Sequence, residues 1–230
     1  MNNLRVFLFI CAAACPVLTA HGQSLVQFPK GPAEWTVAIV PGYSNGHPPY
    51  PAPSTSPELQ IKKIDITKVD GVSRALLTWG DGRTTERWGY DQYHFMILTE
   101  TYNGQPTFAS DLDIQPGGAY YVGFDASSFA WLEPKCLKDT VVYQHKKCYH
   151  YQGTVPIQVF KFSNTNRVVA GIDLFCEAWI DQDTLLPVAL YDGSMLGVFT
   201  FHDPPTTPVT PPPKVQAALQ HFIAAATPLR

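Results

Sequence analysis

The stretch LQIKKIDITKVDGVSRALLTW, residues 59–79, carries a clear strand–turn–strand pattern. Two runs of alternating apolar and polar residues flank Asp70-Gly71, and an Asp-Gly pair in this setting is typical of a two-residue type I′ hairpin turn. That turn predicts the pairs Val69–Val72, Ile66–Ala75 and Ile64–Leu77 on one face, and Thr67–Arg74 and Lys63–Thr78 on the other. Because apolar and polar residues separate by face, the stretch predicts an antiparallel hairpin with one buried side. Leu59 and Ile61 are out of phase with Ile64, which predicts a bulge near Lys62-Lys63.

A second hairpin is predicted around Asp192-Gly193. The same two-residue turn would give the pairs Leu190–Met195 and Leu186–Phe199 on one face, and Ala189–Leu196 and Pro187–Val198 on the other. Both faces are apolar, so this hairpin needs cover on each side. The C-terminal helix could supply one cover, and a facing sheet or an apolar cavity could supply the other.

Most of the remaining pattern is also typical of strands. The further strands we expect are 35–40, 84–88, 90–99, 120–124, 140–151, 157–162 and 168–180. The sequence therefore predicts a mainly β protein, built as one curved antiparallel sheet.

Two proline-rich stretches interrupt the strand pattern. Residues 41–57 and 204–213 each contain six prolines, and proline offers no N–H to a β-ladder. After the second stretch, residues 214–226 predict an amphipathic helix with Val215, Leu219, Phe222, Ile223 and Ala226 on one stripe. We expect this stripe to pack against the sheet.

The N-terminus has the pattern of a removed export signal. Arg5 is its only charge, an apolar run of about 15 residues follows, and a membrane span needs roughly 20. Small residues at Ala20 and Gly22 favour cleavage after Gly22. A lipoprotein signal with Cys15 as the anchor is the rival interpretation, but Pro16 after the cysteine is unusual. The expected location is the periplasm or the extracellular space.

These assignments give four regions. Residues 1–22 form a signal peptide and 23–202 an antiparallel β domain, followed by a proline-rich linker at 203–213 and a C-terminal helix at 214–230. Loss of Arg5 changes the formal net charge from −3 to −4. A mildly acidic chain without a basic cluster argues against nucleic acid as a partner. No segment after the signal is long and apolar enough to span a bilayer.

Three cysteines follow the signal. Cys136 and Cys148 are 12 residues apart, and export makes a disulfide between them plausible. Such a bridge would contribute roughly 3 kcal/mol. Cys176 alternates with Leu174 and Ala178 on an apolar strand face, which favours a buried, inert thiol.

Two clusters invite chemical hypotheses. Cys148 and His150 would share a strand face, but His145 would lie on the other, so a disulfide with two surface histidines is favoured over a zinc site. Glu177 and Asp181 share a face and could serve acid–base catalysis. However, residues 181–184 have turn composition, so Asp181 is better explained as a turn cap.

No nucleophile elbow, phosphate loop or zinc-protease helix motif appears, so we expect neither an enzyme nor a cofactor. Triads assemble in space, and the missing motifs weaken a hydrolase or metalloprotein hypothesis without excluding it. Trp79, Trp88, Trp131 and Trp179 could line a ligand pocket, although core packing is the commoner role for such residues. No ligand-binding residue can be assigned.

The stretches KKCYHY (146–151) and EAWIDQDTLLPVAL (177–190) resemble bacterial exported proteins of the periplasmic lipoprotein-carrier (LolA-like) superfamily. Trp179-Ile180-Asp181, Thr184 and Leu186-Pro187 carry this resemblance, which covers about residues 140–201. It implies an incomplete β-barrel whose concave face holds acyl chains and is plugged by helices. This chain departs from the family by opening with a strand at 35–40 and a proline-rich stretch.

Two functions follow as expectations. The first is a non-enzymatic binding protein for an apolar small molecule, such as a lipid or a lipoprotein acyl chain. The second is a secreted structural or protein-interaction module without a small-molecule ligand, whose aromatic residues form a solid core. An empty apolar groove would favour the first, and a filled sheet face would favour the second.

Overall fold

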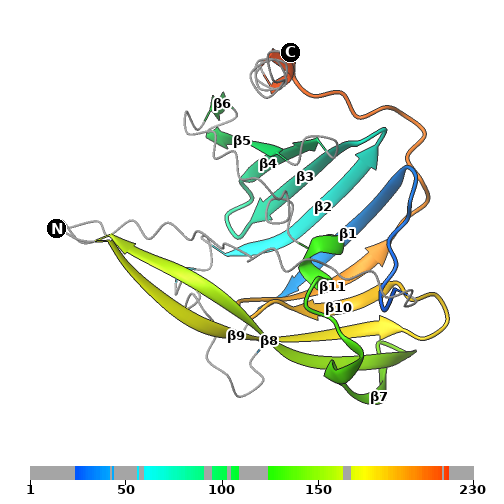
Figure 1. Cartoon of the computed structure of the whole chain (residues 1–230). Helices are drawn as coiled ribbons and strands as arrows, with labels where there is room; N and C mark the ends of the chain where they lie inside the picture. Colours follow the sequence, from blue (N-terminus) through cyan, green and yellow to red (C-terminus); the bar gives the residue numbers. More distant parts are fainter. Residues whose placement is uncertain are drawn as a thin grey trace, which may run out of the picture.

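A computed structural model describes residues 24–41, 43, 56, 60–90, 95–102, 105–108, 124–162, 167–213 and 215–217, some of them by backbone alone. Eleven strands form one sheet in the order β6-β5-β4-β3-β2-β1-β11-β10-β9-β8-β7 (Figure 1). The strands are β1 Ala33–Val40, β2 Ile61–Val69, β3 Val72–Trp79, β4 Thr84–Tyr90, β5 Phe95–Tyr102, β6 Gln105–Phe108, β7 Leu137–Tyr143, β8 Lys146–Phe162, β9 Arg167–Asp181, β10 Pro187–Tyr191 and β11 Leu196–Phe201. Two short 3-10 helices, η2 (Ala126–Phe129) and η3 (Pro134–Cys136), precede β7.

Neighbouring strands of this sheet all run antiparallel, which confirms the predicted antiparallel β architecture. Strand β1 pairs with β2 on one side and with β11 on the other. The first and last strands therefore meet in the middle of the sheet, while β6 and β7 form its two edges. In Figure 1 the strands fan out between these edges, and η2 lies over the centre of the sheet.

The first hairpin has the register that the sequence predicts. Val69 pairs with Val72, and the ladder continues through Ile66–Ala75 and Ile64–Leu77. Asp70 and Gly71 both have positive φ, 51° and 79°, as a type I′ turn requires. The register shifts between Ile61 and Lys63, which confirms the predicted bulge.

The second hairpin has a different register from the predicted one. Tyr191 pairs with Leu196 and Ala189 with Val198, so four residues separate the strands instead of two. The cause is the Asp192 carboxylate, which accepts hydrogen bonds from the backbone N–H groups of Ser194 at 2.8 Å and Met195 at 2.9 Å. This shift of two residues preserves the faces, and both sides of β10 are buried, as expected.

The single strand predicted at residues 140–151 is wrong. It is a hairpin, in which β7 turns into β8 at Gln144 and His145, with φ values of 47° and 63°. Non-glycine residues with positive φ are uncommon. A turn built from Gln144 and His145 was therefore not expected, because it has no glycine to mark it in the sequence. Strand β8 also continues unbroken through Pro156 to Phe162.

The larger hydrophobic core covers one side of the sheet, which we call the inner face. Its strand residues include Trp35, Val37, Ile66, Leu77 and Phe199. The residues that cover it come from outside the strands: Leu25, Val26, Phe28, Phe124, Phe129, Trp131 and Leu132. We call these seven residues the cover. Phe28 lies 5.7 Å from the rings of both Trp35 and Phe129, measured between ring centroids.

A second core lies on the opposite side, the outer face, beneath β9–β11. Its buried members are Cys148, Trp179, Val188, Ala189, Tyr191, Leu196 and Val198. Tyr43, from the first proline-rich stretch, packs against this cluster with its ring centroid 5.1 Å from that of Tyr191. The outer face of β2–β4 carries Lys63–Asp65 and Arg74–Glu86 ion pairs, with Trp88 buried opposite Arg74.

The C-terminal helix is described only at its start. Residues 213 and 215–217 are helical, and Val215 is buried with 1% exposure. Residues 218–226 lie outside the described residues, so a C-terminal amphipathic helix packed on the sheet stays a prediction. Most of the predicted strand 120–124 lies outside them as well.

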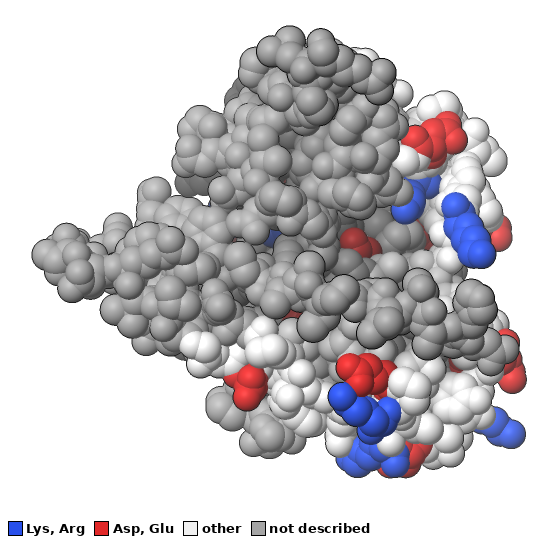
Figure 2. All heavy atoms as spheres, in the orientation of Figure 1, with Lys and Arg blue, Asp and Glu red and all other residues white. Residues whose placement is uncertain are grey.

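None of the helices among the described residues is long and apolar enough to cross a bilayer. Figure 2 shows acidic and basic side chains interspersed over the described part of one face.

Candidate functional site

The outer face of β7–β9 gathers the polar residues that the sequence singles out. The β8–β9 register places Cys148 opposite Asp181, His150 opposite Trp179 and Gln152 opposite Glu177. The predicted common face of Glu177 and Asp181 is therefore confirmed, and Trp179 lies on it as well. Strand β7 adds Asp139 opposite His150.

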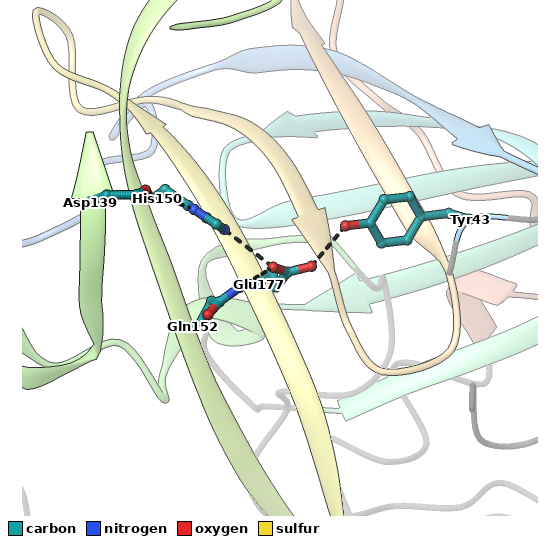
Figure 3. A network of polar contacts seen from close by, with 5 residues as sticks. All are labelled: Tyr43, Asp139, His150, Gln152 and Glu177. Atoms are coloured by element: carbon teal, nitrogen blue, oxygen red, sulfur yellow. Dashed lines mark hydrogen bonds and ion pairs between the residues drawn. The ribbon is translucent and has the colours of Figure 1, made fainter. Parts of the chain in front are cut away.

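Glu177 is the hub of a polar network (Figure 3). The Tyr43 hydroxyl donates a hydrogen bond to Oε2 of Glu177 at 2.7 Å, and the Gln152 amide donates to Oε1 at 2.5 Å. Nε2 of His150 lies 3.2 Å from the same Oε1, while Nδ1 of His150 lies 2.9 Å from Oδ1 of Asp139. The network therefore links β7, β8, β9 and the chain segment that follows β1.

His150 is also held by ring stacking. Its ring lies 4.9 Å from that of Trp179 with an interplanar angle of 7°, and Tyr143 stacks on Trp179 at 5.0 Å. His150 and Trp179 are each 7% exposed and Glu177 is 4% exposed. Burial of this order strengthens the electrostatic contacts within the network.

Each ring nitrogen of His150 faces a carboxylate. Nδ1 lies beside Asp139 and Nε2 lies beside Glu177. Which nitrogen donates a hydrogen bond depends on the tautomer of the ring. The two contacts therefore fix the position of the ring between β7 and β9.

The network joins the chain segment after β1 to strands β7–β9. Glu177 and His150 are both buried, and Glu177 contacts Tyr43, His150 and Gln152. Burial, together with the hydrogen bond to Glu177, raises the pKa of Tyr43 far above its ordinary value, so this phenol stays protonated and donates.

Asp181, the other carboxylate of this face, is a turn cap, as predicted. Its Oδ1 accepts hydrogen bonds from the backbone N–H groups of Asp183 at 2.9 Å and Thr184 at 3.1 Å. Lys146 lies 3.2 Å from the other oxygen. Burial alone would raise the pKa of Asp181, but these hydrogen bonds and the Lys146 ammonium outweigh it and hold the pKa below its ordinary value.

The predicted Cys136–Cys148 disulfide is not formed, and all three described cysteines are free thiols. Cys136 packs on the inner face and Cys148 is buried in the outer cluster. Cys148 lies opposite Val141, five residues along the chain from Cys136; at about 3.3 Å per residue this is roughly 16 Å. A disulfide needs Cα atoms within about 7 Å. Cys176 is buried with a free thiol, as predicted.

The histidines differ from their predicted surface setting. His145 is exposed in the β7–β8 turn, but His150 is buried in the network. Among the residues that the structure describes, no group of three or more His, Cys, Asp and Glu side chains is arranged to hold a metal ion. The stretch around Cys148 therefore supplies network and core residues.

The inner face carries a small pocket near the cover. A pocket of about 90 Å³ lies between the cover and β1–β3, lined by Phe28, Pro29, Trp35, Ile66, Lys68, Ser73, Asp125 and Ala126. Pockets for small molecules usually have about 300–1,000 Å³. The four tryptophans do not line a common pocket, since Trp131 packs on the inner core and Trp179 in the outer one.

Sequence reasoning missed most partners in the network. It grouped Glu177 with Asp181 and His150 with Cys148, because alternation along one strand shows which residues share a face. It missed Asp139 and Gln152, which lie on neighbouring strands, and Tyr43, which precedes Glu177 by 134 residues. Tyr43 lies in a proline-rich stretch, and its apolar residues follow no regular spacing that would predict which of them are buried.

Comparisons with protein-family models, with curated proteins and with solved structures find no match for this chain. The resemblance to the LolA-like superfamily therefore stays an expectation based on residues 146–151 and 177–190.

Proposed function

We propose that this chain is an exported, non-enzymatic binding protein that holds an apolar ligand on the inner face of its sheet. An acyl chain of a lipid or a lipoprotein fits such a face. The expected compartment is the periplasm or the extracellular space, after removal of residues 1–22. The observation that carries the proposal is an apolar sheet face closed by segments that are not part of the sheet.

The cover is attached to the sheet mainly by side chains. Phe28 contacts a cluster of rings that includes Trp35 and Phe199, and Phe124 and Phe129 lie 6.0 and 5.9 Å from the ring of Phe199. Polar attachments include the hydrogen bond from the Gln27 N–H to the Leu185 carbonyl at 2.8 Å and that from Trp35 Nε1 to the Phe124 carbonyl. Apolar contacts of this kind are not directional, so an acyl chain can replace them.

One residue of the cover is held in an unfavourable conformation. Phe124 has a φ of 57°, which is unusual for a bulky residue, and costs of order 1–3 kcal/mol. Among the residues that the structure describes, the buried indole N–H of Trp131 in the cover has no hydrogen-bond partner. Both features lower the free energy needed to displace the cover.

Ligand binding by this route requires the cover to move. The pocket of about 90 Å³ is too small for a long acyl chain. A ligand would therefore take the place of Phe28, Phe124 or Phe129 on the inner face. Its apparent affinity is then reduced by the small fraction of molecules with the cover displaced.

The test is lipid analysis of the purified mature protein, followed by uptake of a fluorescent fatty acid. Phe129→Ala should weaken the cover by about 3 kcal/mol and tighten uptake at least tenfold. Val142→Ala, at an exposed site on β7, is the matched control and should leave uptake unchanged. The absence of co-purified lipid together with no uptake by either protein would contradict the proposal.

A second candidate is a protein-interaction module without a small-molecule ligand. The packing of Trp35, Phe124, Phe129 and Phe199 in the inner core favours it, because these aromatic residues then serve as core alone. In that case Phe129→Ala lowers stability without creating uptake. The same two variants therefore separate the candidates.

A further inference from the structure

The chain leaves the sheet after β11 through a proline-rich strap, which we define as residues 203–213. Six of its residues are prolines, and three of the others are Thr206, Thr207 and Thr210. The strap carries no strand, and helical structure begins only at residue 213. Prolines keep such a backbone extended and without a β-ladder.

The residues of the strap differ in exposure. Pro205, Val209 and Pro211 are half-buried, whereas Thr206, Thr207 and Thr210 are exposed, as are the remaining residues of the strap. The three threonines therefore lie at the surface of the molecule. A modifying enzyme could reach them without unfolding the domain.

We propose that Thr206, Thr207 and Thr210 are acceptors for O-linked sugars. Threonines interspersed with prolines in an exposed, extended segment of an exported chain have the composition of O-glycosylated stalks. The inference rests on the proposed export, because the transferases that recognise such segments act on exported chains.

The transfer uses a nucleotide-activated sugar. The Oγ1 atom of threonine attacks the anomeric carbon, and a new C–O bond forms as the bond between that carbon and the nucleoside diphosphate breaks. The hydroxyl proton passes to a base of the transferase, and the nucleoside diphosphate leaves. The chain itself supplies only the acceptor oxygen and the accessible backbone around it.

The experiment uses the full chain in a secreting animal cell line, once with its own leader and once with residues 1–22 replaced by a proven secretion leader. Intact mass and fragmentation of the strap peptide are measured on the secreted protein. We expect a mass above that of the polypeptide by whole sugar residues located at the three threonines. Thr206→Ala/Thr207→Ala/Thr210→Ala should remove them. Thr200→Ala, which changes an exposed threonine paired on β11, should not.

The two leaders separate the two proposals. Retention of the native-leader chain inside the cells would contradict secretion through residues 1–22 in this cell type and leave the acceptor test to the replaced leader. A secreted chain with the replaced leader that has its bare polypeptide mass would overturn the inference. Sugars that persist in the triple alanine variant would overturn it as well.

Discussion

Cys176 shows how strand alternation fixes the chemistry of one residue. It lies on the inner side of β9 with 3% exposure, and burial raises the pKa of its thiol to about 12. Burial likewise raises the pKa of Cys148, whereas Cys136 is only partly buried. Since the thiolate is the reactive form, the three thiols should differ strongly in reactivity.

Labelling of the folded mature protein with iodoacetamide at pH 8, without reductant, should therefore modify Cys136 first. Cys148 and Cys176 should react only after unfolding in guanidinium, which brings the total to three labels. Mass spectrometry of the labelled peptides reads the result. A total of one label in guanidinium would mean that Cys136 and Cys148 are bridged after all.

Asp181 links residue chemistry to pH. Its folded pKa lies below the ordinary value, so its carboxylate stabilises the fold above the unfolded pKa of about 3.9. This contribution is lost as the pH falls through the folded pKa. Asp181→Ala should lower the free energy of unfolding by about 1–2 kcal/mol at pH 7, and the difference from the parent should shrink below pH 4. Urea unfolding at pH 7 and pH 3 measures it, and Asp183→Ala, at an exposed position of the same turn, should have little effect.

At the level of elements, the polar network around Glu177 shows which features sequence reasoning could not predict. The faces of Glu177 and His150 followed from alternation within β8 and β9, and the register of the β2–β3 hairpin followed from Asp70-Gly71. Neither rule reports which distant residue lies across a sheet face, and so Tyr43 was missed. The β7–β8 turn was missed because its positive-φ residues are Gln144 and His145, which carry no turn signature as strong as Asp-Gly.

Tyr43 and Glu177 should be energetically coupled. Tyr43→Phe removes one hydrogen bond to a buried carboxylate and should cost about 1–2 kcal/mol. In a double-mutant cycle with Glu177→Gln, the interaction energy should be about 0.5–3 kcal/mol, measured by urea unfolding. Tyr143→Phe keeps a stacked ring on the same face and serves as the control. Strictly additive effects would show that Tyr43 contributes only its ring.

Pro156 protects an edge of the sheet. Strand β7 pairs with β8 only from Lys146 to Tyr151. Beyond Tyr151, the edge of β8 that faces away from β9 has no partner strand among the described residues. The Lys147 carbonyl accepts a hydrogen bond from the Gln182 N–H, directly after β9. Odd-numbered residues of β8 therefore direct their backbone N–H and C=O groups toward β9. Even-numbered residues, such as Pro156, direct theirs toward the opposite edge. A proline there withholds an N–H from any added strand.

Pro156→Val should therefore promote self-association. Size-exclusion chromatography with light scattering, after gentle heating, should show more dimer or aggregate than for the parent. Thr154→Val has the same edge-facing phase and adds the same side chain without removing a proline, and so it controls for added hydrophobicity. Equal behaviour of the two variants would show that the proline itself has no protective role.

At the scale of the whole molecule, the antiparallel sheet was predictable because side-chain alternation recurs along most of the chain. The pairing at the centre of the sheet was not predictable, because β1 and β11 join residues about 160 positions apart, for example Trp35 with Phe201. The cover was not predictable either, since Phe28 and Phe124 lie in segments without periodicity. The inner face could be assigned from sequence, but the residues that fill it could not.

A ligand that replaces the cover must stabilise the fold as a whole. Binding to the native state alone adds RT ln(1 + [L]/Kd) to the free energy of unfolding, about 2.7 kcal/mol at one hundred times Kd. A long-chain fatty acid below its micelle concentration should therefore raise the Tm of the mature protein in a dose-dependent way. A short-chain acid of equal charge should not, because it buries too little apolar surface. Phe129→Ala should start from a lower Tm and show the larger rise, since its cover is already weakened. Equal shifts with both acids would assign the effect to the carboxylate and remove the inner face from consideration as an acyl-chain site.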